Sequence, residues 1–76
     1  MPTTLTLKVT DAPGVLVRVA HIFARRSANI SQIHVTHPAD SPWSRMAITI
    51  NDDANIDQLK GQLEKLVDVY SVAKMY

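Results

Sequence analysis

At 76 residues, 46% of them apolar and 20% charged, the chain is predicted to form one globular domain over residues 1–76. Its net charge of +1 provides no strong field for nucleic acid or acidic membranes, and the lack of cysteine excludes disulfides, thiolate metal sites and a cysteine nucleophile. The start of the chain does not resemble a signal peptide, and no apolar run could span a bilayer, so we expect a soluble cytoplasmic protein.

The first half of the chain predicts a strand, a helix and a second strand. Apolar and polar residues alternate over residues 3–10, as in a strand with one buried face. After a break at residues 11–14, apolar residues recur at helical spacing, and the helix closes at Arg25 and Arg26. The predicted stripe is Leu16, Val19, Ala20 and Phe23. Residues 30–37 then form an extended stretch with Ile33 and Val35 on one face.

The second half of the chain repeats this pattern in the order strand, helix, strand. A turn-rich loop over residues 38–42 leads to a strand over 45–50. Asn51, Asp52 and Asp53 offer helix caps, and the last strand covers residues 68–76. The helix between them carries a stripe of Ile56, Leu59, Leu63 and Leu66. The order predicts an α+β fold, a ferredoxin-like βαββαβ sandwich with a four-stranded antiparallel sheet and two helices on one face.

No set of residues predicts catalysis or metal binding. The predicted strand segments 5–9 and 46–50 carry no aromatic side chain, so they lack the platforms of an RNA-recognition motif. His34 and His37 lie three apart on a predicted strand and therefore on opposite faces, unable to share a metal ion. None of the serines has an evident base beside it in the sequence. We expect a non-enzyme with no catalytic residue and no cofactor of its own.

The segment Asp11-Ala12-Pro13-Gly14-Val15-Leu16 lies at a predicted strand-to-helix turn. Backbone N–H groups near Gly14, Val15 and Leu16 could hold a carboxylate, while Asp11 holds an ammonium group. Asp11 could instead serve only as the helix cap. Asn29 could reach this turn from a second copy in a side-by-side dimer, or it could simply close the first helix.

Several single residues leave two interpretations open. Trp43 could anchor a partner or fold back over the hairpin edge. Arg18 and Arg25 could dock on an acidic patch or form a solvated helix surface. Gly61, inside the second helix, indicates either the close approach of another backbone or a tolerated weakness. Tyr70 and Tyr76 are expected to pack.

The turn over residues 11–16 resembles the ligand loop of the ACT domain, an amino-acid-binding regulatory module. A wider resemblance, to the small regulatory subunit of acetolactate (acetohydroxyacid) synthase, short type, extends along the chain. It is carried by Pro13-Gly14-Val15, Phe23-Ala24-Arg25-Arg26, Asn29-Ile30, Asn51-Asp52-Asp53 and Gln62-Leu63-x-Lys65-Leu66-x-Asp68-Val69.

The resemblance implies regulation of branched-chain amino-acid synthesis: activation of a catalytic subunit that holds thiamine diphosphate, Mg and FAD, and feedback inhibition by valine. It implies a homodimer with an amino acid at the interface, and neither nucleic acid nor a membrane as partner. The implied ligand-binding residues are Asp11, Gly14, Val15 and Leu16 of one copy, with Asn29 and Ile30 of the other. Many members carry Asn in place of Asp11. A stand-alone ACT amino-acid sensor, a regulatory fragment of another enzyme and an assembly module without ligand remain alternatives.

Overall fold

The computed structural model describes residues 3–26, 28–51 and 56–75. Its elements follow the predicted βαββαβ order, which confirms the ferredoxin-like fold class. They are β1 (Thr3–Thr10), α1 (Val15–Arg25), β2 (Ile30–Thr36), β3 (Trp43–Ile50), α2 (Ile56–Glu64) and β4 (Val69–Lys74).

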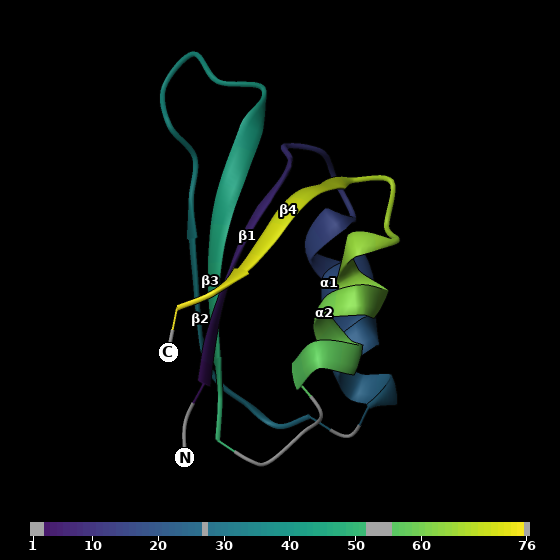
Figure 1. The fold of residues 1–76 in the computed structure, drawn as a ribbon. Helices are drawn as coiled ribbons and strands as arrows, with labels where there is room; N and C mark the ends of the chain where they lie inside the picture. The colour runs from purple at the N-terminus through teal and green to yellow at the C-terminus, as the bar shows by residue number, and fades with distance from the viewer. Residues whose placement is uncertain (1–2, 27, 52–55, 76) are drawn as a thin grey trace.

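The four strands form one antiparallel sheet in the order β2-β3-β1-β4, and both helices lie on the same side of it (Figure 1). The two central strands pair without interruption from Thr3↔Ile50 to Thr10↔Trp43. Each outer strand has one shift in register, at Lys8/Val9 in the pairing of β1 with β4 and at Ile30/Gln32 in that of β2 with β3. The other face of the sheet, which we call the open face, is not covered by a helix.

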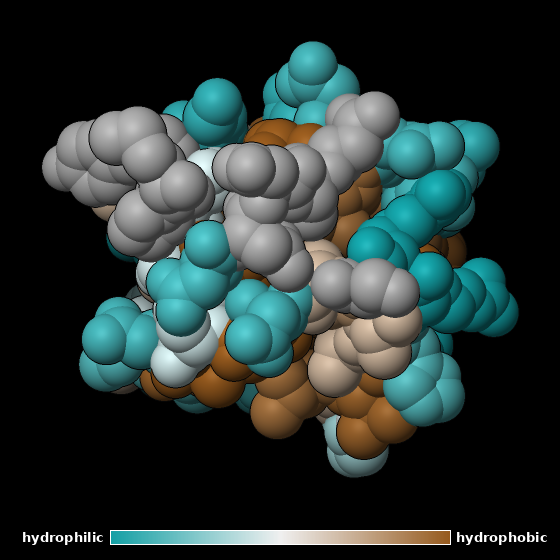
Figure 2. Space-filling view, turned by 90° about the horizontal axis from the view of Figure 1, so that it is seen from below, coloured by the Kyte–Doolittle hydropathy of each residue, from teal (hydrophilic) through white to brown (hydrophobic). Residues whose placement is uncertain are grey.

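The core lies between the sheet and the helices. Alternate residues of the central strands point into it because side chains of a strand alternate between its two faces. Its fully buried side chains are Leu5, Leu7, Val9, Val19, Phe23, Ile48, Ile50, Leu59 and Leu63. Viewed from the end where β1 begins, apolar residues nevertheless reach the surface between hydrophilic ones (Figure 2).

The buried stripe of α1 differs from the predicted one. The helix buries Val15, Val19, Ile22 and Phe23. Leu16 is 45% exposed and was wrongly placed in the stripe. Because residues 15–17 are all apolar, periodicity alone could not decide which of them begins the stripe.

Some boundaries and single residues also differ from the expectation. β2 ends at Thr36, one residue before His37, and β3 begins at Trp43, two residues before Arg45. Tyr70 is 56% exposed, so its expected packing is wrong. The predicted caps Asp52 and Asp53, and Tyr76, lie outside the described residues.

The sequence left two interpretations of Gly61 open: another backbone approaches it closely, or it is a glycine whose cost to helix stability is tolerated. The second interpretation holds. Among the described residues, and apart from its chain neighbours and the backbone of its own helix, no atom lies within 4 Å of the position that a Cβ would take there. In that same part of the chain, no helix has the length and apolar character needed to cross a membrane.

Candidate functional site

The turn between β1 and α1 is built around Gly14. This residue is the N-cap of α1 and has φ 85°, in the left-handed region where only glycine is free of strain. Val15, the first helical residue, is buried, whereas Asp11, Gly14 and Leu16 are exposed. The interpretation of Asp11 as the helix cap is therefore wrong, since Gly14 occupies that position and no side chain caps the helix.

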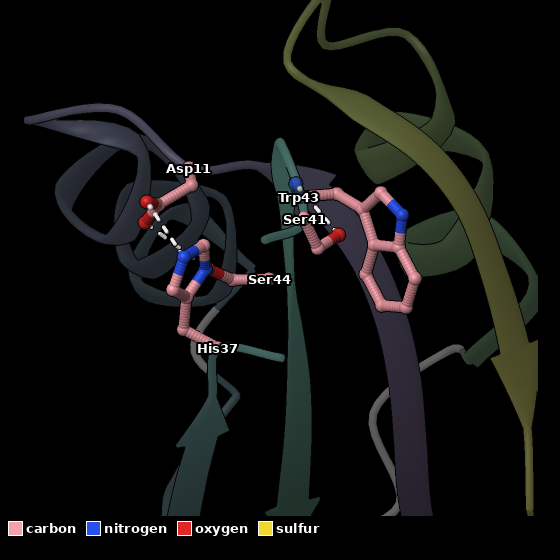
Figure 3. Close-up of polar contacts among 5 residues, drawn as sticks. All are labelled: Asp11, His37, Ser41, Trp43 and Ser44. Atoms are coloured by element: carbon pink, nitrogen blue, oxygen red, sulfur yellow. Dashed lines mark hydrogen bonds and ion pairs between the residues drawn. The ribbon is translucent and has the colours of Figure 1, made fainter. Parts of the chain in front are cut away.

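Asp11 instead contacts the β2–β3 hairpin next to its connecting loop, where β2 ends and β3 begins. Its Oδ1 accepts a hydrogen bond of 3.1 Å from Ser44 Oγ, and its Oδ2 lies 3.5 Å from His37 Nε2. The remaining imidazole nitrogen, Nδ1, lies 3.3 Å from the same Ser44 hydroxyl. Figure 3 shows the imidazole ring of His37 between Asp11 and Ser44. We call these three residues the Asp11 cluster.

The Asp11 cluster was not predicted, because His37 and Ser44 become neighbours only through the pairing of β2 with β3. It places a histidine beside a serine for which the sequence indicated no base. Ser44 is only 4% exposed and donates directly to Asp11, so its hydroxyl is closed to a substrate. The cluster therefore fixes the turn to the start of β3 and leaves the Asp11 side chain 51% exposed.

The turn also presents backbone donors. Asp11 N–H donates to Pro42 O at 3.1 Å, and Ala12 N–H donates to Thr10 O at 3.1 Å. In the described residues, the N–H groups of Gly14 and Leu16 have no backbone acceptor outside the helix. Such groups at a helix start attract an anion. An exposed carboxylate and the amide donors of two exposed residues, Gly14 and Leu16, thus lie within one turn of chain.

Arg18 closes one side of this turn. Its Nε donates to Asp68 Oδ2 at 2.8 Å, which links α1 to the residue before β4. A Cβ at Gly14 would lie 3.2 Å from Arg18 Nη1, so a larger residue there would press on this ion pair. Arg18 is thus not simply a solvated residue of the helix surface.

The other two predicted site residues lie at the opposite end of α1. Asn29 is exposed, and its carbonyl accepts a 3.3 Å hydrogen bond from Asn51 N–H; Ile30 packs partly buried against the core. The helix between Gly14 and Asn29 has 11 residues and is about 16 Å long. One chain therefore does not bring Asn29 and Ile30 to the turn, and a shared pocket would need a second copy.

Trp43 belongs to β3, because this strand begins before the segment 46–50 that was expected to lack aromatic residues. Its ring projects to the side of β3 opposite Ser44, onto the open face (Figure 3). Lys8 Nζ lies 4.3 Å from the ring centroid and Arg45 Cζ lies 5.6 Å from it. Two cations thus contact the ring, which favours the interpretation that Trp43 folds back over the sheet.

Comparison with known proteins agrees with this geometry. The sequence model of the AHAS small subunit-like ACT domain matches residues 5–71. The acetolactate synthase small subunit of Mycolicibacterium smegmatis is 38% identical over 72 residues, which cover 93% of this chain and 42% of that protein. The Escherichia coli K12 isozyme 1 small subunit is 37% identical over 70 residues, covering 92% of this chain and 73% of that protein.

A solved structure of similar sequence has the same fold. The acetolactate synthase small subunit from Thermotoga maritima is 37% identical, with a TM-score of 0.85, over 97% of this chain and 47% of that one. The chain thus spans less than half the length of the mycobacterial and Thermotoga proteins that it matches. In the described residues, no group of three or more His, Asp or Glu side chains could hold a metal ion.

Proposed function

The chain belongs to the acetohydroxyacid synthase small-subunit-like family of ACT domains, and on that premise we propose that it is a non-catalytic regulatory subunit of acetolactate synthase. The single observation that carries the proposal is a match over nearly the whole chain to small subunits of that enzyme. The proposed place of action is the cytoplasm. There the chain would raise the activity of a catalytic subunit and make that activity sensitive to valine in branched-chain amino-acid synthesis. Thiamine diphosphate, Mg and FAD would all reside on that catalytic subunit.

The turn at residues 11–16 supports an amino-acid ligand. A free amino acid carries one carboxylate and one ammonium group, and the turn exposes amide donors close to the Asp11 carboxylate. Gly14 has no side chain to block approach to those amides, and Leu16 offers an exposed apolar surface for an aliphatic side chain. The N–H groups of Gly14 and Leu16 would thus hold the carboxylate, and Asp11 the ammonium group, whereas Val15 N–H already donates to Ala12 O at 3.4 Å.

Dimerisation through α1 and β2 is supported by what one copy leaves uncovered. Ile33 and Val35 pair with Ile48 and Met46 and so share the core face of the sheet, yet they are 43% and 47% exposed. Leu16 is about 200° around α1 from Arg18, whose side chain turns toward Asp68. Leu16 therefore faces away from α2. Ile33 and Val35 belong to β2, which lies at the edge of the sheet. Its free edge can pair with a strand of another molecule.

A two-fold dimer of this kind would complete the proposed site. Two copies of α1 related by a two-fold axis across their length run antiparallel, so the start of one lies beside the end of the other. Asn29 and Ile30 of one copy would then approach the Asp11–Leu16 turn of its partner. Ligand binding would regulate the enzyme to the extent that it favours one dimer arrangement over another.

The direct test combines the purified chain with a catalytic subunit from the same source and measures acetolactate formation with and without valine. We expect the chain to raise the rate and valine to lower it only when the chain is present. An unchanged rate in both assays would remove the synthase assignment. If the chain changes the rate without any valine effect, a thermal-shift screen of the twenty amino acids would reveal another ligand, because a ligand of the folded state raises Tm.

The dimer is tested with Ile33→Glu, which places a charge in the proposed interface. Val67→Glu is the matched control, since Val67 is 92% exposed and lies beyond α2. We expect sedimentation to show a dimer for the wild type and the control, and a monomer without amino-acid binding for Ile33→Glu. A dimeric, ligand-binding Ile33→Glu variant would contradict the shared site.

A further inference from the structure

Two cations face each other on the open face of the sheet. Lys8 of β1 is the register partner of Arg45 of β3, so their side chains leave the sheet side by side. Like charges directly opposite each other destabilise a strand pair. The chain nevertheless places both here, next to each other and to the Trp43 ring.

No carboxylate balances this pair in the part of the chain that the structure describes. The ion pair found there joins Arg18 to Asp68, and the contact of His37 with Asp11 likewise includes neither Lys8 nor Arg45. Asp11 contacts Ser44, whose side chain lies on the buried side of β3, whereas Arg45 points to the open face. Among the described residues, the open face therefore carries positive charge that no carboxylate compensates.

A shallow trough lies beside the two cations. The neighbouring row across the sheet is formed by His34, Ala47, Thr6 and Ala73, and three of these four side chains are small. They leave a hollow of about 590 Å³ that Lys8 and Arg45 border. The hydroxyl of Thr6 is buried in this row and has no hydrogen-bond partner among the described residues. The trough thus has a small-residue floor and a cationic rim.

The two cations are held in place by the Trp43 ring. A cation near an aromatic face is attracted by the ring, and here Lys8 Nζ is 4.3 Å from the centroid. This arrangement reduces the freedom of both side chains before any partner arrives. It also places positive charge against the ring, where a nucleic-acid base would otherwise stack.

We propose that the open face of the sheet docks an acidic surface of the catalytic subunit, with a partner carboxylate between Lys8 and Arg45. The identity of the partner rests on the proposed function. A carboxylate there would relieve the repulsion between the two cations, and a neighbouring short apolar side chain would rest on Ala47 and Ala73. A second copy of the chain is a poor occupant, because none of its four described strands contains an Asp or Glu that could face these cations.

The test measures binding of the purified chain to the catalytic subunit by biolayer interferometry at two salt concentrations. The variant Lys8→Gln/Arg45→Gln removes both charges. Lys60→Gln/Lys65→Gln is the matched control, with the same loss of charge on the helix side of the molecule. A third variant, Ala47→Glu, supplies a carboxylate within the trough and neutralises the pair from inside. Circular dichroism and Tm establish that each variant is folded.

We expect Lys8→Gln/Arg45→Gln and Ala47→Glu each to raise Kd at least about tenfold at low salt, and the lysine control to stay within about twofold. Binding of the double glutamine variant should also depend less on salt. If folded variants bind and activate the enzyme like the wild type, the docking inference is wrong while the regulatory function stands. If the wild type neither binds nor activates the catalytic subunit, both fail. Tight binding of a labelled single-stranded oligonucleotide, lost in the glutamine variant, would also overturn the inference.

Discussion

The Asp11 cluster predicts an energetic coupling between Asp11 and Ser44 that helix capping would not produce. The Ser44 hydroxyl is buried and donates to Asp11 Oδ1 at 3.1 Å. Hydrogen bonds to charged groups contribute about 1.5–3 kcal/mol, and the 51% exposure of the Asp11 side chain places this one below that range. We therefore expect a coupling free energy of about 1 kcal/mol between Asp11→Ala and Ser44→Ala.

The assay is urea unfolding of the wild type, both single variants and the double variant at one fixed protein concentration, because the stability of a dimer depends on concentration. A domain of 76 residues has a total stability of roughly 4–11 kcal/mol, so a coupling of this size is measurable. Ser31→Ala is the matched control. Its hydroxyl donates to Thr49 O at 3.2 Å on another part of the sheet, so its effect should add to that of Asp11→Ala.

Strict additivity of Asp11→Ala and Ser44→Ala would refute the reasoning. Asp11 would then stabilise the protein through a route that does not include Ser44, as a helix cap would. Coupling in the Ser31 control of the same size as in the Ser44 pair would refute it as well, since the effect would not be specific to the contact.

Three further substitutions have expected outcomes that thermal unfolding can check. Gly61→Ala should raise stability by about 1 kcal/mol, because the added Cβ meets no described atom and alanine favours the helix; a lower Tm would contradict this. Gly14→Ala should lower stability by at least about 1–2 kcal/mol through its positive φ and the contact with Arg18, and an unchanged Tm would contradict the turn geometry. Thr6→Val should leave stability equal or higher, since it removes a buried hydroxyl that has no hydrogen-bond partner in the described part of the chain; a clear loss would mean that the hydroxyl is satisfied.

The fold could be predicted because each segment carries its own periodicity. The alternation of Leu5, Leu7 and Val9 and the spacing of Leu59 and Leu63 are local patterns, and all five side chains are fully buried. Residues 15–17 are all apolar, so the spacing of apolar residues does not show which of them faces the core. Leu16 was therefore wrongly placed in the core.

The surroundings of the candidate site could be predicted only in part. The glycine at the strand-to-helix turn was identifiable from its residue type, and the structure places it in the left-handed conformation. The partners of Asp11 were not identifiable, because His37 and Ser44 are 26 and 33 positions away in the chain, and only the hairpin register brings them to the turn. The pairing of Lys8 with Arg45 depends on register in the same way.

The unpaired edge of β2 has a consequence for the tendency of the protein to aggregate. Its regular backbone pairing with β3 runs only over residues 32–36, after the register shift near Ile30, which leaves a short open edge. Such an edge adds any extended chain that reaches it, including nascent or misfolded polypeptide. Pairing of β2 with the same strand of a twin molecule uses up this edge in both copies, whereas addition of β2 to β4 of another molecule leaves a free β2 and a free β4 and allows growth into filaments. A variant that cannot form the β2–β2 dimer proposed above should therefore keep this edge exposed and precipitate more readily than the wild type.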